Sequence, residues 1–490
     1  METDDVKENT DYDDFMIDDD EAEQLFAPIN IESAPVNIES APVNIESAPR
    51  PAFLTVLSST DMIFAYPLSR MELDENDPVM LLRVFYQRFF PFKTYFQWLN
   101  YDTVPTKNFF NREFSFTLAS EVYIRYNSFQ DADELYKEIG RLQPVKIDIG
   151  AVYTTKVRSR SIVFRLTVNY MKRVAPTDML PLSYLITLLQ PKDRKTVPPQ
   201  AFQPVEKELV FDIDMTDYDE VRTCCSGADI CHMCWKFMTI SIKIIDIALR
   251  EDFGFVHLLW VYSGRRGVHC WVCDERARRL TNESRKAIVQ YLEVVKGSMQ
   301  QAQKVKLPNI LPPSLNRSLE ILKQYFEELV LENQRTLDVQ ENWNKLLQIV
   351  PDAAIRETLD HKWQKSSHSK TGSMKWAEFK NEIVVLGEGK AAVLAREIIF
   401  QYCYPRLDDK VSTQINHLLK SPFCVHPKTN RVCVPIDPAR CDEFDPFKVP
   451  TLAQLNKEIN EYNKNSGTTN EERQVAGKKK SWVVSVALEV

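Results

Sequence analysis

The segment Leu209-Val210-Phe211-Asp212-Ile213-Asp214 constrains the fold of this chain most strongly. An apolar run that ends in alternating acidic and apolar residues predicts a β-strand, in which successive side chains point to opposite faces. Asp212 and Asp214 then share one face, while Phe211 and Ile213 anchor the other. Two neighbouring carboxylates offer the oxygen ligands that Mg²⁺ or Mn²⁺ prefers, although Asp-x-Asp alone also fits a loop edge or a capping cluster. The segment therefore predicts a sheet with a divalent-metal site on its acidic face.

Further elements are expected around this strand. Alternating or apolar runs predict strands at 113–118, 122–126, 146–149, 256–262 and 268–273. Helical periodicity is expected over 70–100 and 240–249. The segment 306–394 has long stretches of helical periodicity and many Glu, Lys and Gln residues, and it contains no cluster of candidate catalytic residues. It therefore predicts a helical subdomain.

The first 52 residues differ in composition from the rest of the chain. They carry fifteen acidic and two basic residues, and the motif Asn-Ile-Glu-Ser-Ala-Pro-Val recurs between residues 30 and 49. Low complexity, charge and recurrent proline predict a disordered tail. The tail contributes −13 and the remainder +5 to the net charge of −8. A mildly basic body is compatible with phosphate binding.

Signals for secretion or membrane insertion are not evident in the sequence. The acidic start lacks an apolar signal region, and no run approaches the roughly 18 apolar residues of a membrane helix. We therefore expect a cytosolic or nuclear protein, in which the ten cysteines are thiols or metal ligands rather than disulfides. No Walker or dinucleotide-binding glycine motif is present, so side chains must hold any bound phosphates.

Four cysteines, Cys224, Cys225, Cys231 and Cys234, lie within eleven residues. Four thiolates can close tetrahedrally around Zn²⁺, and Cys-x-x-Cys is a common half of such a site. With all four positions taken by protein, the metal would be structural. Buried free cysteines remain the alternative, and His232 is a possible substitute ligand.

Two further clusters carry polar chemistry. Ser263-Gly-Arg-Arg-Gly-Val-His269 is a short cationic turn between two predicted strands, and arginine matches phosphate oxygens bidentately. A solvated basic turn is the simpler interpretation of this segment alone. The second cluster runs from Pro405 to Lys428, where Asp408 could be a third metal carboxylate and Lys420 and His426 could reach a triphosphate or ribose.

Taken together, these motifs resemble the small catalytic subunits of eukaryotic DNA primases, in the archaeo-eukaryotic primase superfamily. The resemblance runs from about residue 85 to 450. Its most specific strings are Glu-Leu-Val-Phe-Asp-Ile-Asp-Met-Thr-Asp-Tyr-Asp from Glu208 and Ser-Gly-Arg-Arg-Gly-Val-His-Cys-Trp-Val-Cys-Asp from Ser263. The N-terminal tail and a long segment over 155–205 depart from the family pattern but leave the motifs intact.

The resemblance implies a role for each motif residue. Asp212, Asp214 and Asp408 would bind two catalytic Mg²⁺ or Mn²⁺ ions, with Glu113 close to them. Nucleotide contacts would come from basic and polar side chains, namely Arg125, Lys146, Asp148, Ser263, Arg265, Arg266, His269, His417, Lys420 and His426. Among these, Asp148 and His426 would lie at the ribose. Cys224, Cys225, Cys231 and Cys234 would hold a structural zinc ion.

The implied architecture is a mixed α/β (α+β) primase catalytic domain with a zinc motif and a small helical subdomain. We expect a disordered tail over 1–52 and a catalytic domain in two parts, 53–305 with the zinc motif at 224–234, and 395–450. The helical subdomain at 306–394 would lie between these parts, and 451–490 would form a C-terminal tail.

The implied function is synthesis of short RNA primers on single-stranded DNA from ribonucleoside triphosphates, in the nucleus. The implied partners are an iron–sulfur large primase subunit and, through it, the DNA polymerase alpha complex, with no membrane partner. A repair-type primase-polymerase that prefers deoxynucleotides is one alternative. A non-catalytic, zinc-containing replication scaffold is another, from a different functional class.

Overall fold

The computed structural model describes residues 77–157, 202–297, 301–366 and 369–465. The chain divides into two units, Met1–Met80 and Leu81–Val490, and nearly all described residues belong to the second. The tail predicted over 1–52 lies outside the described residues, as does most of the segment at 155–205. In the described ranges, no helix combines the length and the apolar character needed to cross a membrane.

Five strands form the first antiparallel sheet. They are β1 (Arg112–Thr117), β2 (Tyr123–Asn127), β3 (Lys146–Tyr153), β4 (Pro204–Glu206) and β8 (Leu419–Lys420). The order is β2-β1-β3, and both β4 and β8 pair with the free edge of β3. Phe114 packs its ring 5.5 Å from that of Phe109 on one face of β1. Because side chains alternate along a strand, Glu113 and Ser115 occupy the other face.

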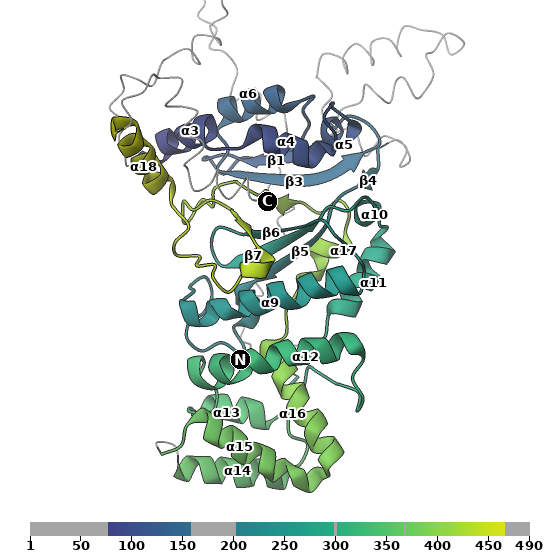
Figure 1. Ribbon diagram of the computed structural model, residues 1–490, viewed down its shortest axis with the longest axis vertical. Coiled ribbons are helices and arrows are strands. Elements are labelled where there is room, and N and C mark those ends of the chain that lie inside the picture. The colour runs from purple at the N-terminus through teal and green to yellow at the C-terminus, as the bar shows by residue number, and fades with distance from the viewer. Residues whose placement is uncertain (1–76, 158–201, 298–300, 367–368, 466–490) are drawn as a thin grey trace, which may run out of the picture. The chain divides into compact units, whose positions relative to one another are not determined.

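Helices cover the aromatic face of this sheet (Figure 1). They are α3 (Pro78–Arg88), α4 (Phe92–Asn100), α5 (Lys107–Phe110) and α6 (Ala132–Leu142). The helical pattern predicted over 70–100 thus forms two helices, since Pro91 interrupts it and precedes α4. This burial leaves the polar face of the sheet available for chemistry.

The second antiparallel sheet contains the predicted acidic strand. Its order is β5-β7-β6-β9, with β5 (Leu209–Asp214), β7 (Gly267–Val272), β6 (Leu258–Tyr262) and β9 (Pro435–Ile436). The strand predicted over 209–214 is confirmed with the same bounds. Phe211 and Ile213 are fully buried, as the alternation predicts, whereas Asp212 and Asp214 are partly exposed.

Helix α9 (His232–Glu251) lies along the second sheet on the side away from the first (Figure 1). Trp260 of β6 is buried and donates from Nε1 to Asp246 of α9 at 3.0 Å. The helix predicted over 240–249 is therefore only the second half of α9. The first half of α9 follows Cys231 of the cysteine motif. Cysteine is not one of the residues that usually precede a helix, so the sequence did not indicate this earlier start.

A helical subdomain extends beyond α9. It contains α12 (Pro313–Phe326), the π-helix η5 (Glu327–Asn333), α13 (Gln340–Leu347), α14 (Ala353–Lys365), α15 (Gly372–Ile383), η6 (Val384–Leu386) and α16 (Glu388–Cys403). Arg317 of α12 pairs with Glu251 and Asp252 at the end of α9, at 2.8 and 2.7 Å. The boundary predicted at residue 394 falls within α16.

Six further helical elements complete the described part of the chain. They are η4 (Met215–Tyr218), α10 (Glu275–Arg278), α11 (Asn282–Leu292), α17 (Asp409–Thr413), η7 (Pro438–Arg440) and α18 (Leu452–Asn465). With two antiparallel sheets and segregated helices, the mixed α/β (α+β) class predicted from the sequence is confirmed.

Only two residues, Lys207 and Glu208, separate β4 of the first sheet from β5 of the second. The Glu208 carboxylate accepts two hydrogen bonds from Arg112, at 2.8 and 3.0 Å, and both side chains are fully buried. Burial raises the pKa of Glu208, but the charge and hydrogen bonds of Arg112 outweigh this effect and lower the pKa to about 2. This ion pair ties β1 to the junction between the sheets.

We expect Glu208→Gln to lower the free energy of unfolding by about 3 kcal/mol, because it leaves the buried Arg112 charge without a counter-ion. Denaturant unfolding at neutral pH measures this loss. The folded-state pKa of about 2 lies below the unfolded value of 4.5. Wild-type stabilisation by this pair is therefore fully present above about pH 4.5 and is lost as pH falls towards 2.

Glu138→Gln serves as the control for this stability test, since its partner Arg141 is half exposed and such surface pairs contribute less than about 1 kcal/mol. Equal effects of the two substitutions, or an acid-induced loss of stability that is unchanged in Glu208→Gln, would contradict the prediction.

Candidate functional site

Asp212 and Asp214 lie on the partly exposed face of β5, opposite the face on which Phe211 and Ile213 are buried. Asp212 lies directly opposite His269 in the β5–β7 register, with Oδ1 3.5 Å from His269 Nε2. Burial and the neighbouring Lys420 charge lower the pKa of His269 to about 3. The imidazole is therefore neutral, and the contact is a weak polar one rather than an ion pair.

Asp408 reaches this strand from a distant part of the sequence. Its main-chain N–H donates to the carbonyl oxygen of Asp212 at 3.1 Å. Its carboxylate caps α17 by accepting a hydrogen bond from the N–H of Lys410 at 3.1 Å. The fold thus brings the third predicted carboxylate beside the first two.

The acidic cluster has an excess of negative charge. Burial and the charges of Asp214 and Asp408 raise the pKa of Asp212 to about 7. Asp214 differs, because hydrogen bonds from Thr216 and Arg266 outweigh burial and lower its pKa. The Arg266 guanidinium lies 2.7 and 2.9 Å from the two Asp214 oxygens. A divalent cation would relieve the repulsion around Asp212, so the donor set fits such an ion.

The cationic turn between β6 and β7 is closed by Ser263. Its Oγ accepts the Gly267 N–H at 3.0 Å. Gly264 has a φ of +87°, and a Cβ there would lie 2.6 Å from Cβ of His426. A larger residue would therefore push the turn away from His426. Arg265 and Arg266 extend from this turn and are partly exposed.

On the first sheet, Glu113 forms the centre of a buried polar group. Its side chain is fully buried and accepts hydrogen bonds from Arg125 Nε at 3.0 Å and from Tyr153 OH at 3.1 Å. Ser115 Oγ lies 3.5 Å from the same carboxylate. Because Arg125 already neutralises Glu113, this carboxylate is less available to a metal than Asp212.

Asp148 and Lys420 lie directly opposite each other on β3 and β8. Lys146 Nζ approaches Asp148 Oδ2 at 3.0 Å, and Lys420 Nζ donates to the Ser263 carbonyl at 3.2 Å. The Lys420 contact joins the first sheet to the cationic turn of the second. The Lys420 charge also acts on Asp212 and His269, so positive charge from the first sheet lies beside the carboxylates of the second.

His417 and His426 also face this region. Burial and the Lys207 charge lower the pKa of His417. Arg125 also lowers it, and these effects outweigh Asp408 and Asp148, which raise it. Burial and the Lys420 charge lower the pKa of His426 to about 3. Both histidines are therefore neutral at physiological pH and can act as hydrogen-bonding groups.

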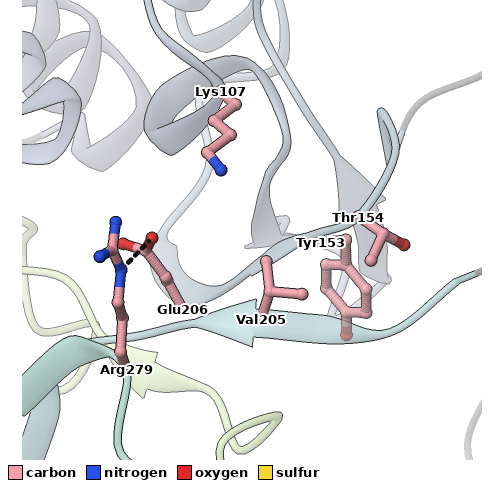
Figure 2. A pocket seen from close by; sticks show the side chains of 6 residues that line it. All are labelled: Lys107, Tyr153, Thr154, Val205, Glu206 and Arg279. Atoms are coloured by element: carbon pink, nitrogen blue, oxygen red, sulfur yellow. Dashed lines mark hydrogen bonds and ion pairs between the residues drawn. The ribbon is translucent and has the colours of Figure 1, made fainter.

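A cavity of about 440 Å³ lies beside the β3–β4 edge. Figure 2 shows the side chains that line it, which are Lys107, Tyr153, Thr154, Val205, Glu206 and Arg279. It contains none of the three aspartates. Tyr153 belongs both to this cavity and to the Glu113 group, since its hydroxyl donates to Glu113. The cavity therefore adjoins the candidate site through one side chain.

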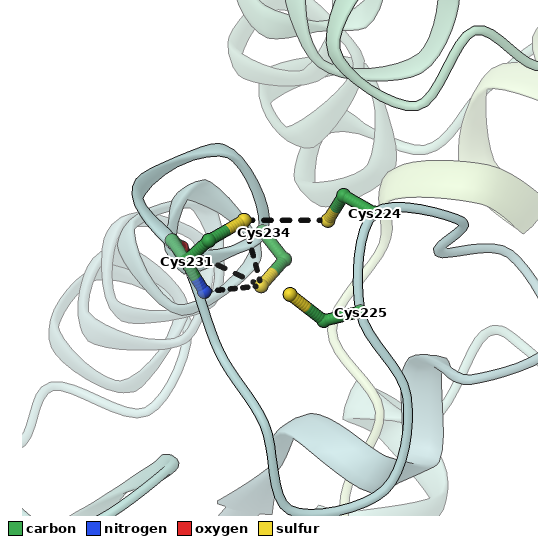
Figure 3. Close-up of side chains that lie close together, drawn as sticks. All are labelled: Cys224, Cys225, Cys231 and Cys234. Atoms are coloured by element: carbon green, nitrogen blue, oxygen red, sulfur yellow. Dashed lines mark hydrogen bonds between the residues drawn. The ribbon is translucent and has the colours of Figure 1, made fainter.

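The four cysteines of the predicted zinc motif converge at the start of α9 (Figure 3). All four sulfur atoms lie within 4.8 Å of one another, with Cys231 3.5 Å from Cys224 and 3.8 Å from Cys234. Tetrahedral ligands at the usual zinc–sulfur distance lie about 3.8 Å apart, so this cluster fits zinc. Among the described residues, no other three or more side chains of Cys, His, Asp or Glu bring their ligand atoms within 4.8 Å of one another, so the oxygens of the three aspartates lie further apart than these sulfur atoms.

Two side chains outside the cysteine motif support it. Gln334, fully buried at the end of η5, donates to Cys224 Sγ at 3.4 Å and accepts the Thr223 N–H at 2.7 Å. Arg222 Nη1 lies 3.8 Å from Cys234 Sγ. Donors to coordinated sulfur orient metal ligands, so the helical subdomain contributes directly to the cysteine cluster.

The sequence did not reveal three of these partners. Tyr153, Lys207 and Gln334 each lie outside the motifs, and each acts through a contact with a residue far away in the chain. Gln334 follows Glu332 and Asn333 in the sequence, and no local pattern distinguishes this buried glutamine from an exposed one.

Comparison with known proteins identifies the family. The family model for the DNA primase small subunit matches residues 211–438. The DNA primase small subunit of Schizosaccharomyces pombe is 43% identical over 387 residues, 78% of each chain. That of Saccharomyces cerevisiae is 35% identical, over 78% of this chain and 86% of its own. The archaeal subunit of Thermococcus kodakarensis is 27% identical, over 49% of this chain and 66% of its own.

The range matched by the family model contains Asp212, Asp214, Asp408, Lys420 and the cysteine cluster, and the two eukaryotic relatives each match 78% of this chain. The chain therefore belongs to the DNA primase small subunit family.

Proposed function

We propose that this chain synthesises RNA primers on single-stranded DNA as the catalytic nucleotidyltransferase of a DNA primase. The observation that carries the proposal is that the fold brings Asp408 beside Asp212 and Asp214, with the cationic side chains of Arg266 and Lys420 next to them. The family relationship supplies the substrate class. Ribonucleoside triphosphates would bind between the two sheets, with their phosphates towards Arg266 and Lys420.

Asp212, Asp214 and Asp408 are the proposed ligands of two divalent cations. When bound, Mg²⁺ or Mn²⁺ would activate the attacking 3′-hydroxyl group and neutralise the leaving pyrophosphate. The contribution of the protein is to hold the three carboxylates on β5 and α17. Glu113 is proposed to position Arg125 at the edge of this group rather than to bind a cation itself.

The nucleotide would be held by side chains from both sheets. Arg265, Arg266 and Ser263 on the turn, together with His269 and Lys420, are proposed to bind the triphosphate. Asp148, Lys146 and His426 are proposed to contact the ribose and neighbouring charge, and His417 the nucleotide. Fixed donors of this kind stabilise charge that develops during phosphoryl transfer, because they need little reorganisation.

The cysteine cluster is proposed to hold one structural zinc ion through Cys224, Cys225, Cys231 and Cys234. The relatives are small subunits by name, so a large primase subunit is the expected partner. An iron–sulfur cluster in that subunit and a further link to DNA polymerase alpha remain proposals. Replication priming in a eukaryote implies action in the nucleus.

We expect Asp212→Asn and Asp214→Asn each to reduce primer synthesis by about 10³-fold, because fixed charge and metal ions supply most of the rate enhancement in phosphoryl transfer. The assay uses the full chain, a single-stranded DNA template, ribonucleotides and Mg²⁺ or Mn²⁺. Asp246→Asn, on α9 behind the same sheet, is the control and should retain activity. Near-wild-type synthesis by either active-site variant would refute the metal assignment.

For the zinc site, we expect Gln334→Leu to accelerate metal loss about 10-fold or more, since supporting hydrogen bonds contribute roughly 10–100-fold to metal affinity. Release of zinc from the full chain to a coloured chelator measures the rate. Gln348→Leu, at an exposed glutamine of the same subdomain, is the matched control. Identical release rates from both variants would show that Gln334 does not support the cluster.

A further inference from the structure

Lys207 is a fully buried lysine at the junction between the two sheets. Its main chain is held on both sides, because its N–H donates to the Arg278 carbonyl at 3.0 Å and its own carbonyl accepts a hydrogen bond from Arg285. The neighbouring Glu206 and Glu208 pair with arginines on the opposite side of this segment. The Lys207 side chain therefore points away from these arginines and reaches the segment that contains His417.

The Lys207 ammonium donates to the main-chain carbonyl of His417. Within the described part of the chain, no carboxylate forms an ion pair with it. Burial and the nearby Arg285 charge lower the pKa of Lys207 from 10.5 to about 7. A buried ammonium without a counter-ion does not stabilise a protein. Stability therefore does not explain why a lysine occupies this position, and we look for a role in function.

The residue that Lys207 holds lies in the loop between Asp408 and Lys420. This loop leaves α17 after Thr413 and enters β8 at Leu419. In the loop, the Ile415 N–H binds Asn282 Oδ1 at 3.0 Å and the His417 carbonyl binds Lys207. These two contacts set the path of the chain between a proposed metal ligand and a proposed phosphate ligand.

We propose that Lys207 is a positioning residue of the nucleotide site, which fixes the 414–418 loop so that His417 and Lys420 face the bound nucleotide. This inference rests on the proposed function, since it needs His417 to contact the nucleotide. Lys207 itself touches no reacting group. Its effect passes through the His417 carbonyl.

The test compares Lys207→Met with the full wild-type chain in extension of a primed template. Methionine has a similar length and no donor. Loss of a charged hydrogen bond should raise the KM for ribonucleotide about 10-fold, with a smaller change in kcat, because loss of substrate binding appears mainly in KM. The melting temperature should be unchanged or higher, since the substitution removes a buried charge.

Lys375→Met is the matched control. Lys375 is also fully buried and also donates to a main-chain carbonyl, that of Leu337 at 2.7 Å, but it lies on α15 in the helical subdomain. This variant should leave the KM for ribonucleotide unchanged, because Lys375 contacts none of the proposed nucleotide ligands. The same pattern in Lys207→Met would overturn the proposal, because it would assign Lys207 a purely structural role.

A double variant tests the route through His417. His417→Ala should raise the KM, and adding Lys207→Met should raise it little further if both act on one contact. Independent, multiplying effects would overturn the proposal. Asp212→Asn, measured alongside, separates the two hypotheses. Activity retained in Asp212→Asn refutes the proposed function, whereas inactivity there with a wild-type KM in Lys207→Met refutes only the positioning role.

Discussion

The structure depends on how the short connection between its two sheets is held. Glu206, Lys207 and Glu208 run from one sheet to the other, and buried arginines bind the connection on one side through carboxylates and carbonyls. A loose connection would let the sheets shift relative to each other. Since Lys420 belongs to the first sheet and Asp212 and His269 to the second, such a shift would separate Lys420 from the two groups on which its charge acts.

The three aspartates are balanced unevenly by positive charge. Burial and the charges of Asp214 and Asp408 raise the pKa of Asp212. Arg266, on the turn of the same sheet, pairs with Asp214, whereas among the described residues Asp408 forms no ion pair. A cluster that was already neutral would have little attraction for a metal ion, so the negative charge that remains favours a divalent cation.

The local sequence pattern predicted those parts of the site whose residues are close together in the sequence. The alternation in Leu209–Asp214 placed two aspartates on one face, and the spacing of Cys224, Cys225, Cys231 and Cys234 predicted the cluster that the fold brings together. The pairing of the two-residue strand β8 with β3, and the contacts of Lys207 and Gln334, join segments distant in sequence. No single-sequence periodicity encodes such contacts, because they depend on the tertiary fold.

The contact between Arg266 and Asp214 has a consequence for the order of ligand binding. In the free protein each group is the partner of the other, at 2.7 Å. A cation that binds Asp214 releases Arg266 for phosphate, and a triphosphate that binds Arg266 releases Asp214 for the cation. On the proposed assignments the two ligands therefore favour each other's binding by the same factor, as thermodynamic linkage requires. Such cooperativity would let the protein discriminate the metal–nucleotide complex from either component alone.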